Sequence, residues 1–177
     1  MNFCNQCGAK VEFRTPPGDH LPRHICDSCG AIHYQNPRLV VGCVPEYEGK
    51  ILLCRRGIEP RRGFWTVPAG FMENDETASQ AALRETLEEA GASVELGAPF
   101  SMISVPRANQ VHLFYLGRLV DLGFKPGDET LEVNLFDEER IPWKEIAFRT
   151  VGATLRHWFA DRRRGAFGFH AEDLAPL

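Results

Sequence analysis

Three glutamates in the middle of the chain have a spacing that could hold a metal ion. Glu85, Glu88 and Glu89 lie in residues 77–90, a segment whose composition predicts a helix. At about 100° per residue, these positions fall within an arc of about 100° on one side of that helix. Crowded carboxylates raise one another's pKa, and Mg²⁺ or Mn²⁺ relieves the repulsion. The trio therefore predicts a metal site, with a solvated acidic helix face as the alternative.

The helix that would carry these glutamates has recognisable ends. Thr77 begins a capping box, and Gly91 is a typical stop signal after the last turn. Leu83, Leu87 and Ala90 follow one another at helical spacing. We expect this apolar stripe to pack against the core, which would leave the carboxylates on the opposite side.

A second constellation, near the N-terminus, is built from cysteines. Two C-x2-C pairs are separated by eighteen residues: Cys4, Cys7, Cys26 and Cys29. This spacing is typical of zinc ribbons, in which four thiolates at about 2.3 Å complete a closed, structural Zn²⁺ site. A disulfide pair or free thiols are the alternatives. Because four cysteines fill the metal shell, the nearby histidines are expected not to be ligands: His20, His24 and His33. The ribbon is expected to brace the adjacent domain or a dimer, with nucleic-acid or protein binding as the alternative.

The composition is that of a folded protein with one hydrophobic core. Of 177 residues, 44% are hydrophobic and 25% are charged. The net charge of −4 argues against a dedicated nucleic-acid-binding protein. The sequence has no apolar run of the roughly 20 residues that a membrane span needs and no signal-peptide core. We therefore expect a cytoplasmic location, where thiols stay reduced and paired cysteines bind metal.

The elements that must position both sites alternate along the middle of the chain. Runs rich in branched and aromatic residues predict strands at 39–45, 51–55, 64–67, 101–105, 111–120 and 131–136. A second helix is expected at 148–164, with Leu155, Trp158 and Phe159 on its buried face. These patterns predict a ribbon over residues 1–35, a catalytic α/β or α+β domain over 36–165 and a C-terminal tail over 166–177.

Residues 70–92 match the signature of a known family, G-x5-E-x7-R-E-U-x-E-E-x-G-U, in which U is apolar. All seven fixed positions are present: Gly70, Glu76, Arg84, Glu85, Glu88, Glu89 and Gly91. Thr86 and Ala92 occupy the U positions as mild departures. The chain therefore resembles the Nudix hydrolases. This resemblance implies an α/β/α sandwich around a mixed sheet, and Mg²⁺-dependent hydrolysis of a nucleoside diphosphate linked to another group.

The resemblance also implies roles for the residues of this box. Glu85, Glu88 and Glu89 would ligate one or more Mg²⁺ (or Mn²⁺) ions or serve as the base of the reaction. Arg84 and Glu76 would hold the loop and the helix in place. The ion would neutralise the diphosphate oxygens and lower the pKa of the attacking water. An ADP-linked substrate would then release AMP.

Ligands outside the helix are expected to complete the metal shell. In related enzymes the backbone carbonyl that corresponds to Ala69 often joins it. A later acidic residue often does so too, and Glu132, in the strand before Ile141-Pro142, best fits that place. Glu129 is the alternative, and an ordinary outward-facing strand residue is the other interpretation of Glu132.

The ribbon in front of the domain narrows the resemblance. NADH pyrophosphatases share it, but they carry Ser-Gln-Pro-Trp-Pro-Phe-Pro where this chain reads Ser-Val-Pro-Arg-Ala-Asn-Gln over residues 104–110. The whole chain is more similar to ribbon-bearing bacterial Nudix proteins, whose plant chloroplast relatives are FAD and ADP-ribose pyrophosphatases. The matching stretches are residues 33–37, 53–56 and 65–73. The implied substrate is FAD or ADP-ribose.

Basic side chains close to the box are candidates for phosphate contacts. Arg55, Arg56 and Arg61, with Arg62, flank a glycine-containing hairpin, and solvated surface arginines are the alternative. Competing functions are an NADH or RNA 5′-cap-like hydrolase and, from another class, a nucleotide-sensing or nucleic-acid-binding module without catalysis. The intact box glutamates disfavour the last. We expect a small nucleotide substrate, no membrane contact and a homodimer.

Overall fold

The computed structural model describes residues 1–174. The chain divides between Asn36 and Pro37 into two compact units, close to the predicted boundary between residues 35 and 36. Each unit contains its own sheet. Among the described residues, no helix is both long and apolar enough to cross a membrane.

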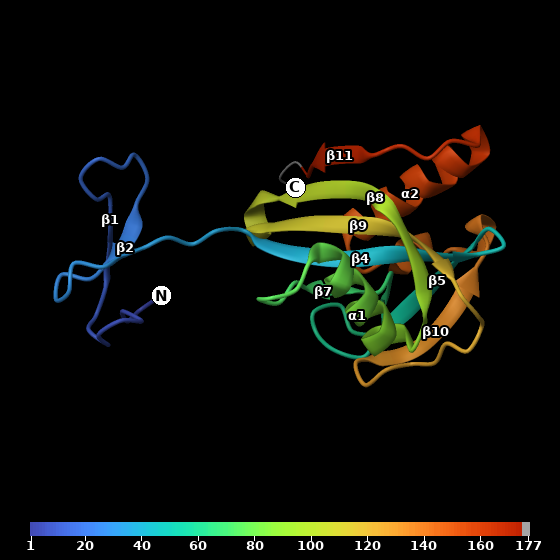
Figure 1. Cartoon of the computed structure of the whole chain (residues 1–177), viewed down its shortest axis with the longest axis horizontal. Coiled ribbons are helices and arrows are strands. Elements are labelled where there is room, and N and C mark those ends of the chain that lie inside the picture. The colour runs from blue at the N-terminus through green and yellow to red at the C-terminus, as the bar shows by residue number, and fades with distance from the viewer. Residues whose placement is uncertain (175–177) are drawn as a thin grey trace. The chain divides into compact units, whose positions relative to one another are not determined.

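The N-terminal unit is a small antiparallel sheet next to a cluster of cysteines. Its strands are β1 (Glu12–Arg14), β2 (Arg23–Ile25) and β3 (Ile32–His33), paired in that order (Figure 1). Cys4 and Cys26 are among its buried side chains, 3% and 0% exposed. A unit of this size cannot bury a large apolar core, so a metal bound by the cysteines is the expected source of its stability.

The C-terminal unit is built on one mixed sheet with the strand order β10-β5-β4-β9-β8-β11. The pairs β4–β9 and β8–β11 are parallel, and the other pairs along this path are antiparallel. Two short strands, β6 and β7, pair with β5 and β4. The strand bounds are β4 Arg38–Tyr47, β5 Lys50–Arg56, β6 Trp65–Thr66, β7 Ala69–Phe71, β8 Val94–Val105, β9 Gln110–Leu119, β10 Thr130–Phe136 and β11 His170–Asp173. Short 3-10 helices are η1 Pro106–Ala108, η2 Glu138–Arg140 and η3 Trp143–Glu145.

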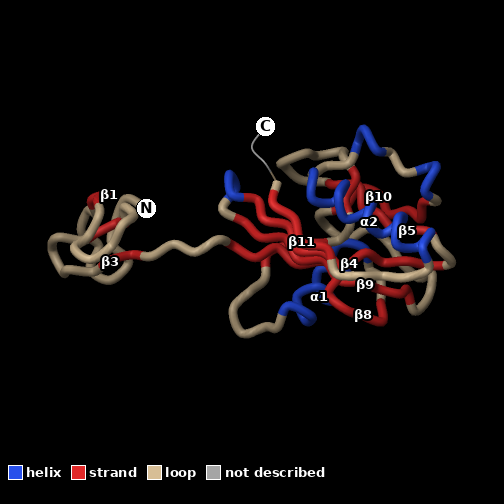
Figure 2. The backbone as a smooth tube through the Cα atoms, turned by 90° about the horizontal axis from the view of Figure 1, so that it is seen from above, coloured by secondary structure: helices blue, strands red, loops and turns tan. Residues whose placement is uncertain are grey.

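One long helix lies on each face of this sheet, α1 (Ala78–Ala90) on one and α2 (Arg149–Arg164) on the other (Figure 2). Successive residues of a strand point to opposite faces. On β4, Val41 packs in the α1 layer and Val44 in the α2 layer. The α2 layer holds the larger core, to which the second helix contributes Leu155, Trp158 and Phe159 as predicted. The predicted sandwich around a mixed sheet is confirmed.

Of the apolar stripe predicted for α1, Ala90 is buried, but the prediction is wrong for the two leucines. Leu83 and Leu87 are 40% and 58% exposed. The helix instead buries small side chains: Ala81, Ala82, Thr86 and Ala90. Short side chains allow the helix to approach β4 and β7 closely, which is why a Cβ added at Gly70 would lie 2.2 Å from the Glu85 carboxylate. The glutamates therefore flank the packed face of the helix and do not lie opposite to it.

Three pieces of the sheet were not predicted: β7, the first part of β8, and β11. The last lies in residues 166–177, which we expected to be a tail. In the structure, His170–Asp173 pair in parallel with Ser101–Ser104 of β8 (Figure 1). The segment is only partly apolar, and its partner strand is about 70 residues away in sequence, so local composition gives little sign of it.

Candidate active site and zinc cluster

Two carboxylates of α1, those of Glu85 and Glu89, lie against the backbone of β7. Glu85 lies against the backbone of Gly70, and its side chain is 12% exposed. One turn further on, Glu89 accepts a hydrogen bond from the backbone N–H of Ala69 at 2.9 Å. The glycine is required here because any larger side chain would displace the Glu85 carboxylate. The β7 backbone thus holds two glutamates of the box side by side.

The proximity of these two carboxylates has an electrostatic cost. Burial, together with the negative charge of Glu85, raises the pKa of Glu89 to about 7, although the Ala69 N–H and the charge of Arg56 oppose the rise. Burial also raises the pKa of Glu85, against the pull of Arg84. Each carboxyl is therefore easier to ionise when a cation lies beside it.

Arg84 is the cation that the chain itself supplies. Its guanidinium donates to Glu76 twice, from Nη2 at 2.7 Å and from Nε at 3.1 Å. Its Nη1 reaches Glu85 at 2.8 Å and Glu88 at 2.9 Å, and its Nη2 also donates to the Phe71 carbonyl at 3.2 Å. These bonds lower the pKa of Glu76. Arg84 thus ties the loop after β7 to the helix.

The donor set of α1 fits a hard divalent cation, but the three carboxylates are not gathered into a cage. Glu85 and Glu89 offer oxygen ligands whose raised pKa values a cation would reverse. Glu88 is turned toward Arg84, and its side chain is 56% exposed. Among the described residues, the four N-terminal cysteines are the one group of three or more potential ligands whose atoms lie within 4.8 Å of one another.

The structure separates the two later acidic candidates. Glu132 contacts Arg55 at 3.5 Å and Asn134 at 2.6 Å, and it does not line the pocket described below. Glu129 does line that pocket, and its charge raises the pKa of Glu89. A backbone hydrogen bond of 2.7 Å from Gly57 to the Glu129 carbonyl fixes this loop.

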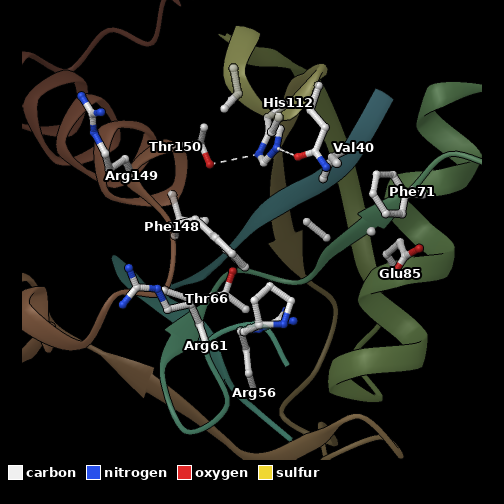
Figure 3. A pocket seen from close by; sticks show the side chains of 18 of the residues that line it. Val40, Arg56, Arg61, Thr66, Phe71, Glu85, His112, Phe148, Arg149 and Thr150 are labelled. Carbon is white, nitrogen blue, oxygen red and sulfur yellow. Dashed lines mark hydrogen bonds between the residues drawn. The ribbon is translucent and has the colours of Figure 1, made fainter. Parts of the chain in front are cut away.

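A pocket of about 840 Å³ opens beside the glutamates on the α2 face of the sheet. Its floor comes from alternate residues of the parallel pair β4 and β9: Val40, Gln110, His112 and Phe114. Glu85 enters from α1, and Phe148 and Thr150 enter from the start of α2 (Figure 3). The pocket therefore has the glutamates on one side, and apolar and uncharged polar side chains line other parts of it.

Two of the four candidate arginines reach this pocket. Arg56 and Arg61 line it, and the Arg56 guanidinium lies over the Phe148 ring, 5.0 Å from its centroid (Figure 3). Arg55 does not line the pocket; it donates to the Gly63 carbonyl at 2.9 Å. Arg62 is also absent from the residues that line it. The end of β5 and the loop that follows it thus bring two cationic groups to the cavity that the glutamates also line.

A polar relay forms the wall across from Glu85. The two ring nitrogens of His112 lie 3.0 Å from Thr150 Oγ1 and 3.0 Å from Gln110 Oε1 (Figure 3). Burial lowers the pKa of His112 to about 4, so the ring is neutral at pH 7. An amide oxygen only accepts, so Nε2 donates to Gln110 and Nδ1 accepts from the Thr150 hydroxyl. This leaves the Gln110 amide N–H groups and a Thr150 lone pair for a ligand.

Sequence reasoning did not find this wall. The predicted strand at 111–120 contains His112, and the predicted helix at 148–164 begins with Phe148 and Thr150, but neither pattern predicts a role for these residues at the site. The alternation of residues 110, 112 and 114 on one strand face was the available signal. This alternation indicates a pocket wall only once the sheet order is known, because that order places this face of β9 next to α2.

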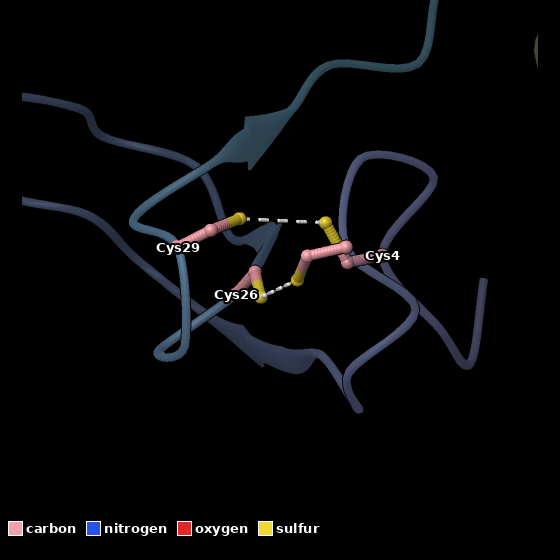
Figure 4. Close-up of side chains that lie close together, drawn as sticks. Cys4, Cys26 and Cys29 are labelled. Carbon is pink, nitrogen blue, oxygen red and sulfur yellow. Dashed lines mark hydrogen bonds between the residues drawn. The ribbon is translucent and has the colours of Figure 1, made fainter.

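The N-terminal cluster brings the four predicted cysteines together. Cys4 Sγ lies 3.7 Å from Cys29 Sγ, and Cys7 Sγ lies 3.4 Å from Cys26 Sγ (Figure 4). A tetrahedral Zn²⁺ with bonds of about 2.3 Å requires sulfur atoms about 3.8 Å apart. Backbone N–H groups of Gly8 and Gly30 close the two knuckles on the carbonyls of Cys4 and Cys26, at 2.9 and 2.8 Å. The sulfur positions therefore fit zinc.

Known proteins resemble both units of the chain. A family model described as Nudix N-terminal matches residues 2–35, and one described as NUDIX domain matches residues 36–159. An ADP-ribose pyrophosphatase of Methanocaldococcus jannaschii is 31% identical over 119 residues, which are 65% of this chain and 69% of that protein. An NAD-capped RNA hydrolase of Chromobacterium violaceum is 29% identical over 158 residues, 88% of this chain, and the match spans 57% of that protein.

A solved structure extends the similarity to almost the whole chain. The crystal structure of a Nudix hydrolase from Nitrosomonas europaea is 52% identical, with a TM-score of 0.95, and the alignment covers 98% of this chain and 99% of that one. The NUDIX domain model alone matches well over half of the residues, and it contains the glutamates that meet at Gly70. With its carboxylate helix, its pocket and its four-cysteine ribbon, this chain belongs to the Nudix hydrolase family.

Proposed function

We propose that the protein hydrolyses the pyrophosphate bond of an ADP-linked compound of the ADP-ribose or FAD type, with Mg²⁺ as cofactor, and releases AMP. The observation that carries this proposal is the junction of the Glu85–Glu89 pair with a pocket of about 840 Å³. That volume is in the range of sites that enclose a small organic ligand. The similarity to an ADP-ribose pyrophosphatase supports the choice of substrate.

Glu85 and Glu89 would hold the Mg²⁺, joined by Glu88 and the Ala69 carbonyl. When bound, the ion neutralises the phosphate oxygens and activates the attacking water. For the later acidic ligand we favour Glu129 over Glu132, because Glu129 lines the pocket and Glu132 is engaged by Arg55. Mn²⁺ suits the same oxygen donors.

The chain's own residues would position the substrate and move one proton. Arg56 and Arg61 supply positive charge where the diphosphate enters, and Phe148 offers a ring for a flat base. A carboxylate of the site takes a proton from the water as the water oxygen attacks phosphorus. The P–O–P bond breaks, and the second phosphate leaves with its sugar. Arg84 acts as a positioning residue through its bonds to Glu76 and Glu85.

The test is release of AMP from ADP-ribose and FAD in the presence of Mg²⁺. We expect Glu89→Gln to lower kcat by roughly 10²–10⁴-fold, since it removes a charged ligand or base without changing the side-chain shape. Glu95→Gln, on an exposed pair with Arg118 outside this pocket, is the matched control and should keep wild-type turnover. Full turnover by Glu89→Gln would refute the assigned site.

A second substrate belongs in the same assay. The similarity to the NAD-capped RNA hydrolase extends over 88% of this chain and includes both units. NAD-capped RNA and NADH should therefore be compared with ADP-ribose at equal concentration. We expect lower kcat/KM for both. The net charge of −4 disfavours a polyanionic RNA, and residues 104–110 lack the Trp-Pro-Phe-Pro stretch of the NADH pyrophosphatases.

The remaining proposals concern the ribbon and the assembly. We propose that Cys4, Cys7, Cys26 and Cys29 hold one structural Zn²⁺. The protein is further proposed to be a cytoplasmic homodimer. Sedimentation of the zinc-loaded protein measures its oligomeric state, and a monomer at all concentrations would overturn the proposed homodimer.

A further inference from the structure

The last described strand lies outside the part of the chain that the NUDIX domain model matches. That model ends at residue 159, whereas β11 begins at His170. β11 runs beside β8 and above α2 (Figure 1). The ladder ends with a hydrogen bond of 3.0 Å from the Leu174 N–H to the Ser104 carbonyl. Leu174 also lines the pocket proposed to bind substrate.

Alternate side chains of this segment face α2. His170 donates from Nε2 to Asp161, a fully buried carboxylate, at 2.8 Å. Glu172 accepts from Nε2 of His157, and the two histidine rings stack with centroids 4.0 Å apart. Because both partners are carboxylates that only accept while ionised, each histidine must carry its proton on Nε2. The two pairs fix which face of the strand meets the helix.

These two pairs also fix how far the strand extends along the helix. Two residues of strand advance about 6.6 Å, and four residues of helix advance about 6 Å. The step from His170 to Glu172 therefore matches the step from Asp161 to His157. One further step brings Leu174 toward the first turns of α2, the end from which Thr150 lines the pocket.

The end of the pocket beside Leu174 differs chemically from the rest. Leu174 follows Asp173, which pairs with Ser104, so the residues after Ser104 lie nearest to it. Val105, Pro106, Arg107 and Ala108 all line the pocket, as do Gln110, which pairs with Val105, and Thr150. Of the phenylalanines that line the pocket, Phe114 lies four residues beyond Gln110 on β9, Phe71 lies on β7, which pairs with β4 and not with β8 or β9, and the Arg56 guanidinium lies over Phe148. His112, two residues from Gln110, is 9% exposed and has both ring nitrogens engaged. A flat base would therefore find its stacking partners elsewhere, and this end suits a group with hydroxyls.

We propose that the C-terminal segment, residues 165–174, is a specificity element, in which Leu174 closes a subsite for the terminal ribose of ADP-ribose and excludes the three-ring flavin of FAD. The inference rests on the proposed pyrophosphatase function. The Gln110 amide and the Thr150 oxygen bind the hydroxyls of the sugar. His157 and Glu172 are positioning residues, because they act through the placement of the strand.

The test compares kcat/KM for ADP-ribose and FAD in three variants of the full-length protein. Leu174→Ala opens the subsite and should raise the FAD to ADP-ribose ratio of kcat/KM roughly tenfold, because it removes the side chain that excludes the flavin. Glu172→Ala should move the ratio in the same direction, and Glu172→Gln, which keeps the acceptor oxygen, should restore it. Leu122→Ala, at an exposed leucine outside the pocket, is the matched control and should leave the ratio unchanged.

A folded Leu174→Ala protein whose FAD to ADP-ribose ratio of kcat/KM is unchanged would overturn the inference, even if kcat/KM changed by the same factor for both substrates. If the wild-type protein cleaves neither compound, the proposed function fails, and the inference is then tested on binding alone. Calorimetric titration without added Mg²⁺ compares the affinities of wild type and Leu174→Ala for both compounds. A gain in FAD affinity relative to ADP-ribose supports the subsite, and its absence, or the absence of any binding, refutes it.

Discussion

The two candidate metal sites of this chain differ in how far they are assembled by the fold. In the ribbon, the sulfur pairs Cys4–Cys29 and Cys7–Cys26 already lie 3.7 and 3.4 Å apart. On α1, the carboxylates of Glu85 and Glu88 are held by one guanidinium instead. A closed shell suits an ion that stays, and an incomplete shell suits an ion that arrives with phosphate ligands. The comparison predicts a tightly held zinc and an exchangeable magnesium.

The largest expected effect is on the ribbon. Cys26→Ser removes one of four thiolates at a buried position, so the zinc content should fall from about one ion per chain to near zero. Cys54→Ser, which removes a buried thiol in the C-terminal unit, should leave the zinc content unchanged. Metal analysis by mass spectrometry gives the answer. A Cys26→Ser protein that retained its zinc after dialysis would contradict the claim that the four cysteines form a closed zinc site.

A second, smaller effect concerns the surface on which the glutamates lie. Gly70→Ala would place a methyl group within 2.2 Å of the Glu85 carboxylate, so kcat/KM should fall roughly 10–100-fold as the carboxylate shifts. Gly168→Ala is the matched control, because a Cβ there meets nothing within 4 Å and should have no effect. Equal activity of the two variants would mean that Glu85 does not need this position. Circular dichroism of both proteins checks that the fold is intact.

A third effect concerns stability and not activity: a pH dependence of the free energy of unfolding that only the carboxylate site should show. The pKa of Glu89 is raised to about 7, so folding disfavours its charged form. A raised carboxyl pKa gives stability that is fully present below the unfolded value, about pH 4.3, and is lost as the pH rises through 7. Without added Mg²⁺, the free energy of unfolding of the C-terminal unit should fall by about 4 kcal/mol across this range.

Two controls sharpen that measurement. Glu89→Gln cannot ionise at this position, so its unfolding temperature should vary less between pH 5 and pH 8. Added Mg²⁺ should recover the lost stability at pH 8 more than at pH 5, because it binds the charged carboxylates. A wild-type protein that is equally stable at both pH values without magnesium would contradict the burial of Glu89. Thermal melts at matched ionic strength provide the comparison.

Local spacing was enough to predict that the four cysteines gather and that Glu85 and Glu89 lie one turn apart on one helix. Each C-x2-C pair and the box glutamates lie within short stretches, so the positions within each stretch follow from knuckle and helix geometry. The ends of α1 were also correct, since Thr77 forms the capping box with Gln80 and Gly91 is left-handed with φ of 57°. These features depend on neighbours a few residues away.

What the sequence could not predict depends on distant partners. Leu83 and Leu87 follow a helical stripe, yet the sheet selects Ala81 and Ala82 because the helix lies so close to it. Glu129 lines the pocket and Glu132 does not, and this difference depends on how β10 and the loop before it pack against β5. The far wall of the pocket requires β9 and α2 to meet, through the bond between His112 and Thr150.

The short strand β11 also determines whether the outer edge of β8 has unpaired backbone N–H and C=O groups. Among the described strands it is the last member on its side of the sheet, so it satisfies backbone groups of Ser101–Ser104 that would otherwise point outward. Unpaired strand edges are templates for association between copies of a chain. Loss of β11 would therefore replace a four-residue edge strand by the twelve-residue β8, and we expect this longer unpaired edge to cause aggregation in concentrated protein.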